Sequence, residues 1–96
     1  MATFEALKPP PTALENGGTE VLRAAIVDGG LHVSLRRAFD DPEAWGMLMA
    51  DLTRHVARIY ATEMNMREEE TLARVRGIFE AEMDAPTDPG STIAIS

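Results

Sequence analysis

The residues that could do chemistry in this chain are two histidines and the charged side chains near them. Asp51 precedes His55 by four residues, about one helical turn, so its carboxylate can orient the imidazole or hold one corner of a metal site. Arg23 and Arg36 accompany His32 in a predicted strand pair, where they can hold an anion or an acidic partner. The candidate polar or ligand site therefore consists of His32, Arg36, Arg23, His55 and Asp51.

These side chains are not part of any catalytic or metal-binding sequence pattern. The chain has no cysteine, which excludes disulfides and thiolate metal sites. The acidic run 68–70 lacks a Glu-x-x-His partner and suits the solvated first turn of a helix. Asp28-Gly29-Gly30 precedes neither a helix nor a lysine, so it is not a phosphate-binding loop. We therefore expect no catalytic residue, no metal and no cofactor.

The composition bounds the class of protein and its partners. Ninety-six residues suffice for one small domain with one core. Nine basic residues against sixteen acidic ones give a net charge of −7, which argues against nucleic acid and against anionic membrane surfaces as partners. No apolar run is long enough to cross a bilayer, and no secretory signal is visible at the start. We expect a cytoplasmic protein.

A β-hairpin is predicted by two alternating apolar segments, residues 20–27 and 31–37, separated by Asp28-Gly29-Gly30. A two-residue turn at either Asp28-Gly29 or Gly29-Gly30 keeps the apolar sets of both strands on one face. We expect that face to be buried against helices. Its members are Leu22, Ala24, Ile26, Val33 and Leu35.

Two helices are predicted after the hairpin. Asp41 is a suitable N-cap before Pro42, and the first helix should run to about Met64. Asn65 should cap the second helix, which Pro86 ends. Trp45 opens a stripe of large apolar residues on the first helix and should be largely buried. The stripe comprises Trp45, Leu48, Met49, Leu52, Val56, Ile59 and Tyr60.

A line of small residues runs beside this stripe and would allow another backbone to approach closely. Its interface candidates are Gly46, Ala50, Ala57 and Ala61. The second helix of the same chain or a second copy could occupy this line. The hairpin also leaves two edges that a second copy could pair with, so we expect a homodimer with two-fold symmetry.

The predicted fold class is α+β, with a β-hairpin packed on two α-helices in the order ββαα. In the homodimer this unit would be paired into a larger sheet or a helix bundle. Residues 1–19 form an arm that carries proline and glycine, residues 20–85 form a single ββαα domain, and residues 86–96 form a tail. Ile93 and Ile95 alternate in the tail and could add a short strand to a sheet edge.

The order of these segments resembles a known family. The carrying features are the runs VLRAAIVDGGLHVSL, at residues 21–35, and DDPEAWGMLMADLTRHVARIY, at residues 40–60, together with the proline-bearing arm. The chain resembles a family of small alphaproteobacterial proteins classed as a domain of unknown function, over about residues 9–85. The resemblance implies a bacterial, cytoplasmic protein and supplies no catalytic residue.

The sequence favours a small non-enzymatic interaction or regulatory module over an enzyme. This follows from the missing catalytic set and from apolar surface in excess of what one hairpin face can cover. The alternative is an enzyme or small-ligand binder whose polar site forms at a dimer interface around His32 and Arg36.

Overall fold

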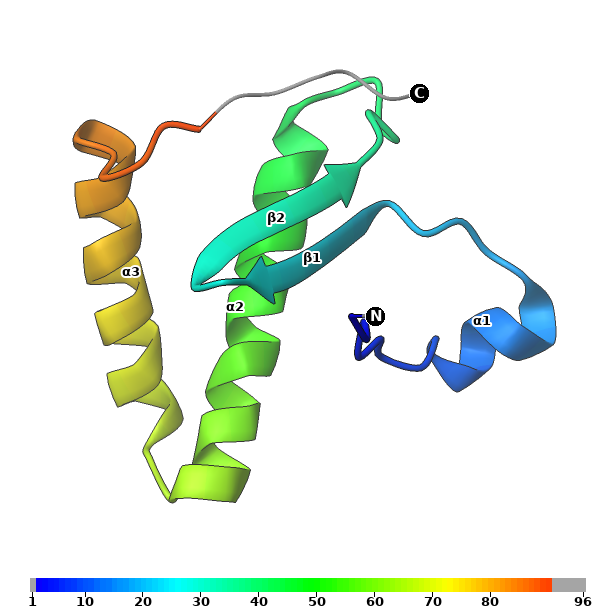
Figure 1. Ribbon diagram of the computed structural model, residues 1–96. Helices are drawn as coiled ribbons and strands as arrows, with labels where there is room; N and C mark the ends of the chain where they lie inside the picture. Colours follow the sequence, from blue (N-terminus) through cyan, green and yellow to red (C-terminus); the bar gives the residue numbers. More distant parts are fainter. Residues whose placement is uncertain (1, 91–96) are drawn as a thin grey trace. The chain divides into compact units, whose positions relative to one another are not determined.

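The computed structural model describes residues 2–90 and shows a hairpin followed by two long helices (Figure 1). The elements in chain order are α1 (Pro11–Asn16), β1 (Leu22–Val27), β2 (Gly30–Leu35), α2 (Glu43–Met64) and α3 (Glu68–Asp84). The predicted α+β class and the order ββαα are confirmed. In the described part of the chain, no helix combines the length and the apolar character needed to cross a membrane.

Two compact units make up the described chain, residues 2–38 and residues 39–90. The first holds α1 and the hairpin, and the second holds α2 and α3. Ala38, the last residue of the first unit, has a φ of 55°, a left-handed conformation that costs a residue with a Cβ about 1 kcal/mol. The single domain over residues 20–85 stays a prediction.

The hairpin turn is formed by Asp28 and Gly29. Their φ values of 51° and 80° are both positive, as a type I′ turn requires. The register pairs Leu22 with Leu35, Ala24 with Val33 and Ile26 with Leu31. This is the first of the two alternatives that the sequence left open, and it places the apolar set of both strands on one face.

The apolar face of the hairpin is not covered by other residues of its own unit. Ile26 is 71% exposed and Val33 is 50% exposed, and Leu31 and Leu35 are similar. Alternation predicts which side chains share a face but not what covers that face. The helices belong to the other unit, so burial of this face against them stays a prediction.

The N-terminal arm contacts β1 in the first unit. The Arg23 guanidinium lies over the Phe4 ring, 5.7 Å from its centroid, which is a cation–π distance. Leu7, in contrast, is almost fully exposed and does not hold the arm. Within the arm, α1 begins at Pro11 and ends at Asn16, before Gly17 with a φ of 78°.

The start of α2 follows the capping expected from the sequence. The Asp41 carboxylate accepts a hydrogen bond from the Glu43 amide at 2.9 Å, and Pro42 already has helical dihedral angles. Trp45 packs edge-on against Phe39 with ring centroids 5.4 Å apart. Most of the Trp45 side chain is covered, as the sequence predicts, although the residue is not fully buried.

Asn65 ends α2 instead of starting α3, which corrects its expected role. Its φ of 53° is left-handed, and its amide donates to the Tyr60 carbonyl. Asparagine tolerates this conformation better than most residues, so it can serve as a helix C-cap. Helix α3 begins two residues later than a cap at Asn65 would place it, with Arg67 before its first turn.

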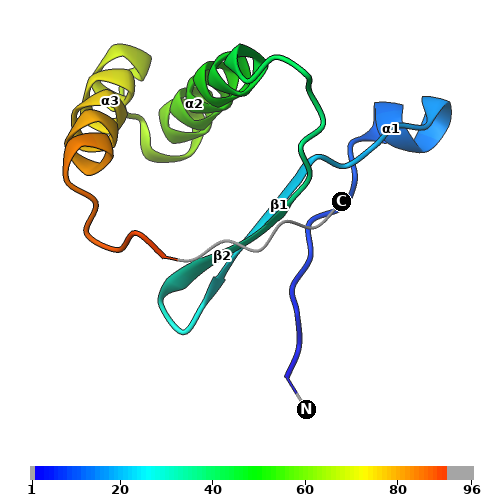
Figure 2. The same ribbon diagram turned by 90° about the horizontal axis from the view of Figure 1, so that it is seen from above.

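Helices α2 and α3 lie side by side and diverge from the Asn65 turn (Figures 1 and 2). Within residues 2–90, only Ala57 and Thr71 are classed as buried, at 1% and 4% exposure. They belong to these two helices, one to each. A helical pair held by two small side chains has very little core.

The chain after α3 folds back onto the last turn of that helix. The Glu82 carboxylate accepts hydrogen bonds from the hydroxyl and from the amide of Thr87, the latter at 2.8 Å. The predicted strand at Ile93 and Ile95 lies outside the described residues.

These two hydrogen bonds predict a measurable titration. The Thr87 hydroxyl, and then its amide, lower the pKa of Glu82 by bonding to the charged form. A carboxylate with a depressed pKa stabilises the fold-back above its unfolded pKa, and the stabilisation is lost as pH falls through the folded pKa. Side-chain NMR should find the Glu82 pKa below its ordinary value and returned toward it in Thr87→Ala. An unchanged Glu82 titration in Thr87→Ala would show that the bonds do not persist in solution.

Candidate functional site

The hairpin brings three of the candidate polar residues to one face. Arg23 pairs with Ser34 and Ala25 pairs with His32, so Arg23 and His32 project opposite to the Leu22 set. Arg36 follows at the end of β2 and donates its amide to the Val21 carbonyl at 3.2 Å. Arg23 and Arg36 line a shallow depression of about 230 Å³, whose lining does not include His32.

Arg23 is already paired with groups of its own unit. Its Nη2 lies 3.1 Å from Glu20 Oε2, and its Nε donates to Oε1 of the same carboxylate. Together with the Phe4 ring, these contacts give Arg23 a structural role between arm and hairpin. Both side chains of the ion pair are largely exposed, so we assign it little stability.

The second pair of candidates lies on α2. Asp51 and His55 line the same shallow groove with Met47, Leu48 and Phe39. His55 Nδ1 lies 3.4 Å from Arg58 Nη1, which can only donate, so this nitrogen is the acceptor. His55 therefore contacts Arg58 along the helix. His32 and His55 belong to different units. Within residues 2–90, no three His, Asp or Glu side chains are grouped in a way that could hold a metal ion.

The line of small residues on α2 has two different surroundings. Gly46 and Ala50 are exposed and line a groove between α2 and α3. Ala57 is buried on the helical pair, and Ala61 is half-buried. Helix α3 of the same chain packs against the Ala57 end of this line, and a second copy at Gly46 and Ala50 stays a prediction. Ala57 is therefore not accessible to a second copy.

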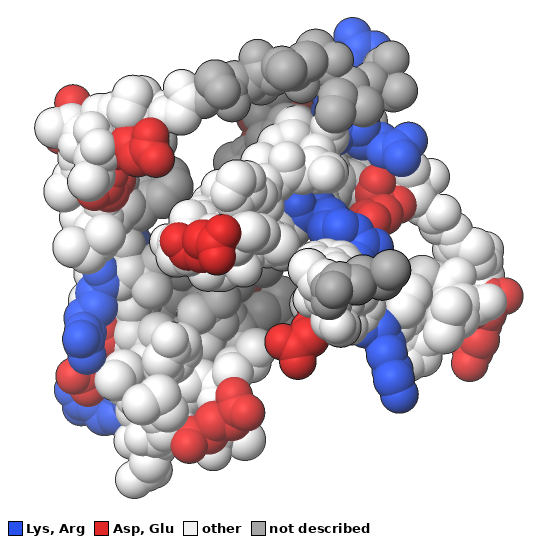
Figure 3. Space-filling view, viewed as in Figure 1, with Lys and Arg blue, Asp and Glu red and all other residues white. Residues whose placement is uncertain are grey.

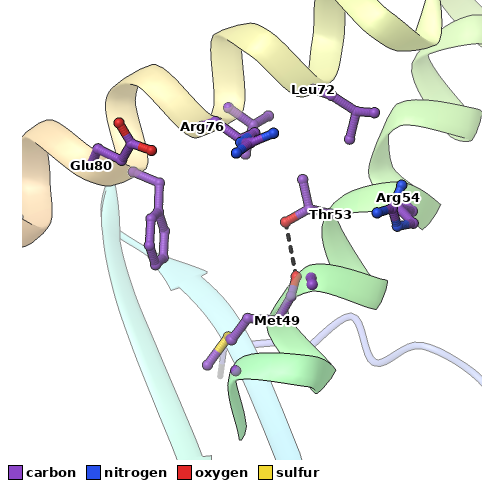
Figure 4. Close-up of a pocket in the computed structure, with 10 residues that line it drawn as sticks. Met49, Thr53, Arg54, Leu72, Arg76 and Glu80 are labelled. Carbon is purple, nitrogen blue, oxygen red and sulfur yellow. Dashed lines mark hydrogen bonds between the residues drawn. The ribbon is translucent and has the colours of Figure 1, made fainter. Parts of the chain in front are cut away.

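The groove that Gly46 and Ala50 line is named the Arg54 groove and has a volume of about 420 Å³. Thr53 and Leu72 extend from opposite helices into the space between α2 and α3 (Figure 4). The Thr53 hydroxyl donates back to the Met49 carbonyl at 2.9 Å, which satisfies it within its own helix. Three charged side chains belong to the lining, namely Arg54, Arg76 and Glu80.

A second and larger groove, of about 640 Å³, also lies between the two helices and is named the Tyr60 groove. Most of its lining is apolar or aromatic, and Arg74 is its one charged member. The lining consists of Val56, Tyr60, Met64, Met66, Thr71, Arg74, Val75, Ile78 and Phe79. Ile78 is 69% exposed, Met64 is 63% exposed and Phe79 is 52% exposed. The Tyr60 groove is thus a large concave surface of the helical unit with a mostly apolar lining.

Thr71, in the lining of the Tyr60 groove, has a buried polar atom that lacks a hydrogen bond within residues 2–90. Its Oγ1 is buried and has no hydrogen-bond partner among the described residues. A buried hydroxyl without a partner costs roughly 1–3 kcal/mol of stability. The contact between α2 and α3 is thus small and also carries an unsatisfied polar group.

The sequence analysis did not identify the Tyr60 groove, although a signal for it was present. On α2 the line of small residues and the stripe of large ones are separated by about 120° at 100° per residue. A single packed helix cannot cover both. Helix α3 packs against Ala57, and Leu52, Ile59 and Tyr60 are not covered by it.

Charged side chains of both signs are interspersed on the face that Figure 3 shows, with uncharged surface between them. For the described residues, no extended area of one sign dominates this face. The Tyr60 groove is distinguished by its apolar lining, in which Arg74 is the one charged residue.

The fold and the sequence together identify the family. The model of DUF5076, described as a domain of unknown function, matches residues 6–87. The chain belongs to the DUF5076 family. The resemblance to a domain of unknown function that the hairpin and helix motifs suggested is thereby confirmed. A search of the curated proteins finds no match.

A solved structure resembles this DUF5076 member over its full length. It is described as the structure "of a putative pyruvate dehydrogenase from the photosynthetic bacterium Rhodopseudomonas palustrus CGA009". The two chains are 42% identical, the match covers 100% of each, and the TM-score is 0.79. The sequence and the backbone are therefore similar throughout.

Proposed function

We propose that this DUF5076 chain is a non-enzymatic protein-interaction module that binds its partner through the Tyr60 groove. The observation that carries the proposal is the exposure of Met64, Ile78 and Phe79 around a concave apolar surface on two helices. Soluble proteins seldom leave contiguous apolar patches of more than a few hundred Å² uncovered, and such patches usually bind other proteins.

The small core of the helical unit also supports a partner. Within residues 2–90, Ala57 and Thr71 are the buried residues, so α2 and α3 have little core of their own. We infer that the chain works in a complex.

The name of the Rhodopseudomonas structure favours a second candidate, an enzyme or small-ligand binder that acts on pyruvate. The residues available for it are His32 and Arg36, completed by groups from a partner chain. A direct test follows pyruvate consumption by the purified chain, with His32→Ala as the matched variant. Consumption that the variant abolishes would overturn the non-enzymatic proposal.

Capture of partners from cells that naturally make the chain tests the interaction. The baits are the tagged wild type, Ile78→Glu, which places a charge in the Tyr60 groove, and Thr62→Glu, which alters the exposed polar side of the same helical pair. We expect at least one protein, which can be an untagged copy of the chain itself, to be enriched by the wild type and by Thr62→Glu and to be lost with Ile78→Glu. Equal recovery by all three baits would contradict the proposal.

A further inference from the structure

We propose that the Tyr60 groove is filled by the Tyr60 groove of a second copy, so that α2 and α3 of two chains form one four-helix core with two-fold symmetry. This inference rests on the proposed function, because it names the partner of the same groove. Four-helix cores are built from apolar side chains of facing helices, and each chain here supplies two helices with such side chains exposed.

The small core of the helical unit favours a second copy over an unrelated protein. Ala57 and Thr71 are the buried residues that the described chain provides, so α2 and α3 have little to hold them together alone. A helical pair with so small a core is stable only when a partner covers it, so its folding is inseparable from association. A second copy is always present in equal amount, and two-fold dimers are the commonest closed assembly.

The distribution of charge selects the Tyr60 groove over the Arg54 groove. Near a two-fold axis each charged side chain meets its own copy, so like charges face one another. The chain carries a net charge of −7, and two copies can approach closely only where charges are sparse. The Tyr60 groove has one charged residue, Arg74, whereas the Arg54 groove has three. The centres of stable interfaces are depleted of charge in the same way.

The absence of cysteine permits a clean cross-linking test. Because the natural chain has none, a single introduced cysteine can form a thiol cross-link only between copies. We would introduce Ile78→Cys in the Tyr60 groove and Thr62→Cys on the exposed polar side of α2, and treat each with a bis-maleimide spanning about 10 Å, the spacing of packed helices. The expected result is a covalent dimer with Ile78→Cys and monomer with Thr62→Cys. Equal cross-linking of the two variants would overturn the proposed surface.

Sedimentation equilibrium provides the second readout. The wild type and Thr62→Glu should be dimers at micromolar concentration, and Ile78→Glu should raise the dissociation constant by about 30-fold or more, as expected at the centre of an interface. If Ile78→Glu fails to fold, the cross-linking of Ile78→Cys decides whether the Tyr60 grooves of two copies face each other. A wild type that is monomeric throughout this range overturns the second copy as partner. The proposed function still stands in that case if the wild-type bait captures a different protein that the Ile78→Glu bait loses.

Discussion

Replacing Ala57 by glutamate should unfold the pair formed by α2 and α3. Ala57 is 1% exposed on the helical pair, so the glutamate must either bury an unpaired carboxylate or push the helices apart. An uncompensated buried charge costs about 3–5 kcal/mol, which is a large part of the stability of a small domain. Thermal unfolding followed by circular dichroism at the helix band should show loss of the cooperative transition or a large fall in its midpoint.

Ala50→Glu is the matched control for this substitution. Ala50 lies on the same line of α2, two turns earlier, and is exposed at the Arg54 groove. The same chemical change there should alter the stability by no more than about 0.5 kcal/mol. If Ala57→Glu and Ala50→Glu melt alike, α3 does not pack against Ala57 in solution.

Replacing Thr71 by valine should stabilise the protein. Valine has nearly the shape of threonine but no hydroxyl, so the variant removes a buried Oγ1 that has no hydrogen-bond partner among the described residues. The two residues have similar helix propensities, and the gain should be about 1 kcal/mol. For a domain of this size, that gain corresponds to a rise of roughly 4–8 °C in the melting temperature.

Thr71→Ser separates the two parts of the threonine side chain. It keeps the hydroxyl and deletes the methyl group, so the melting temperature should fall below that of the wild type. A melting temperature that falls in Thr71→Val as well would mean that the hydroxyl has a partner in solution. A second chain that donates to or accepts from Oγ1 would be the first candidate for that partner.

Local features of this protein could be predicted from the sequence alone. The hairpin follows from alternation and from Asp28-Gly29, which tolerates the two positive φ values of the turn. The start of α2 follows from the Asp41 carboxylate, which bonds an amide two residues ahead. These features involve groups a few residues apart, so neighbouring side chains and backbone dihedral angles determine them.

The candidate site could be predicted only in fragments. The alternation of side chains along the two strands, together with the register, places Arg23 and His32 on one face of the hairpin. Arg23 and Glu20 are only three residues apart, but the contact of Arg23 with Phe4 depends on how the arm folds back, which no periodicity describes. The left-handed conformation of Asn65 likewise depends on where α2 stops, and an N-cap and a C-cap can carry the same residue type.

Tertiary structure alone decided which apolar surface of α2 is covered. The sequence showed a line of small residues and a stripe of large ones, and both were credible packing faces. Helix α3 packs against the Ala57 end of the small residues, while Ile59 and Tyr60 remain exposed. Periodicity in the sequence predicts that a face is apolar. Whether the face is buried depends on which of several apolar surfaces packs against it. Those surfaces are distant in the chain or belong to another molecule, so the Tyr60 groove could be recognised only in three dimensions.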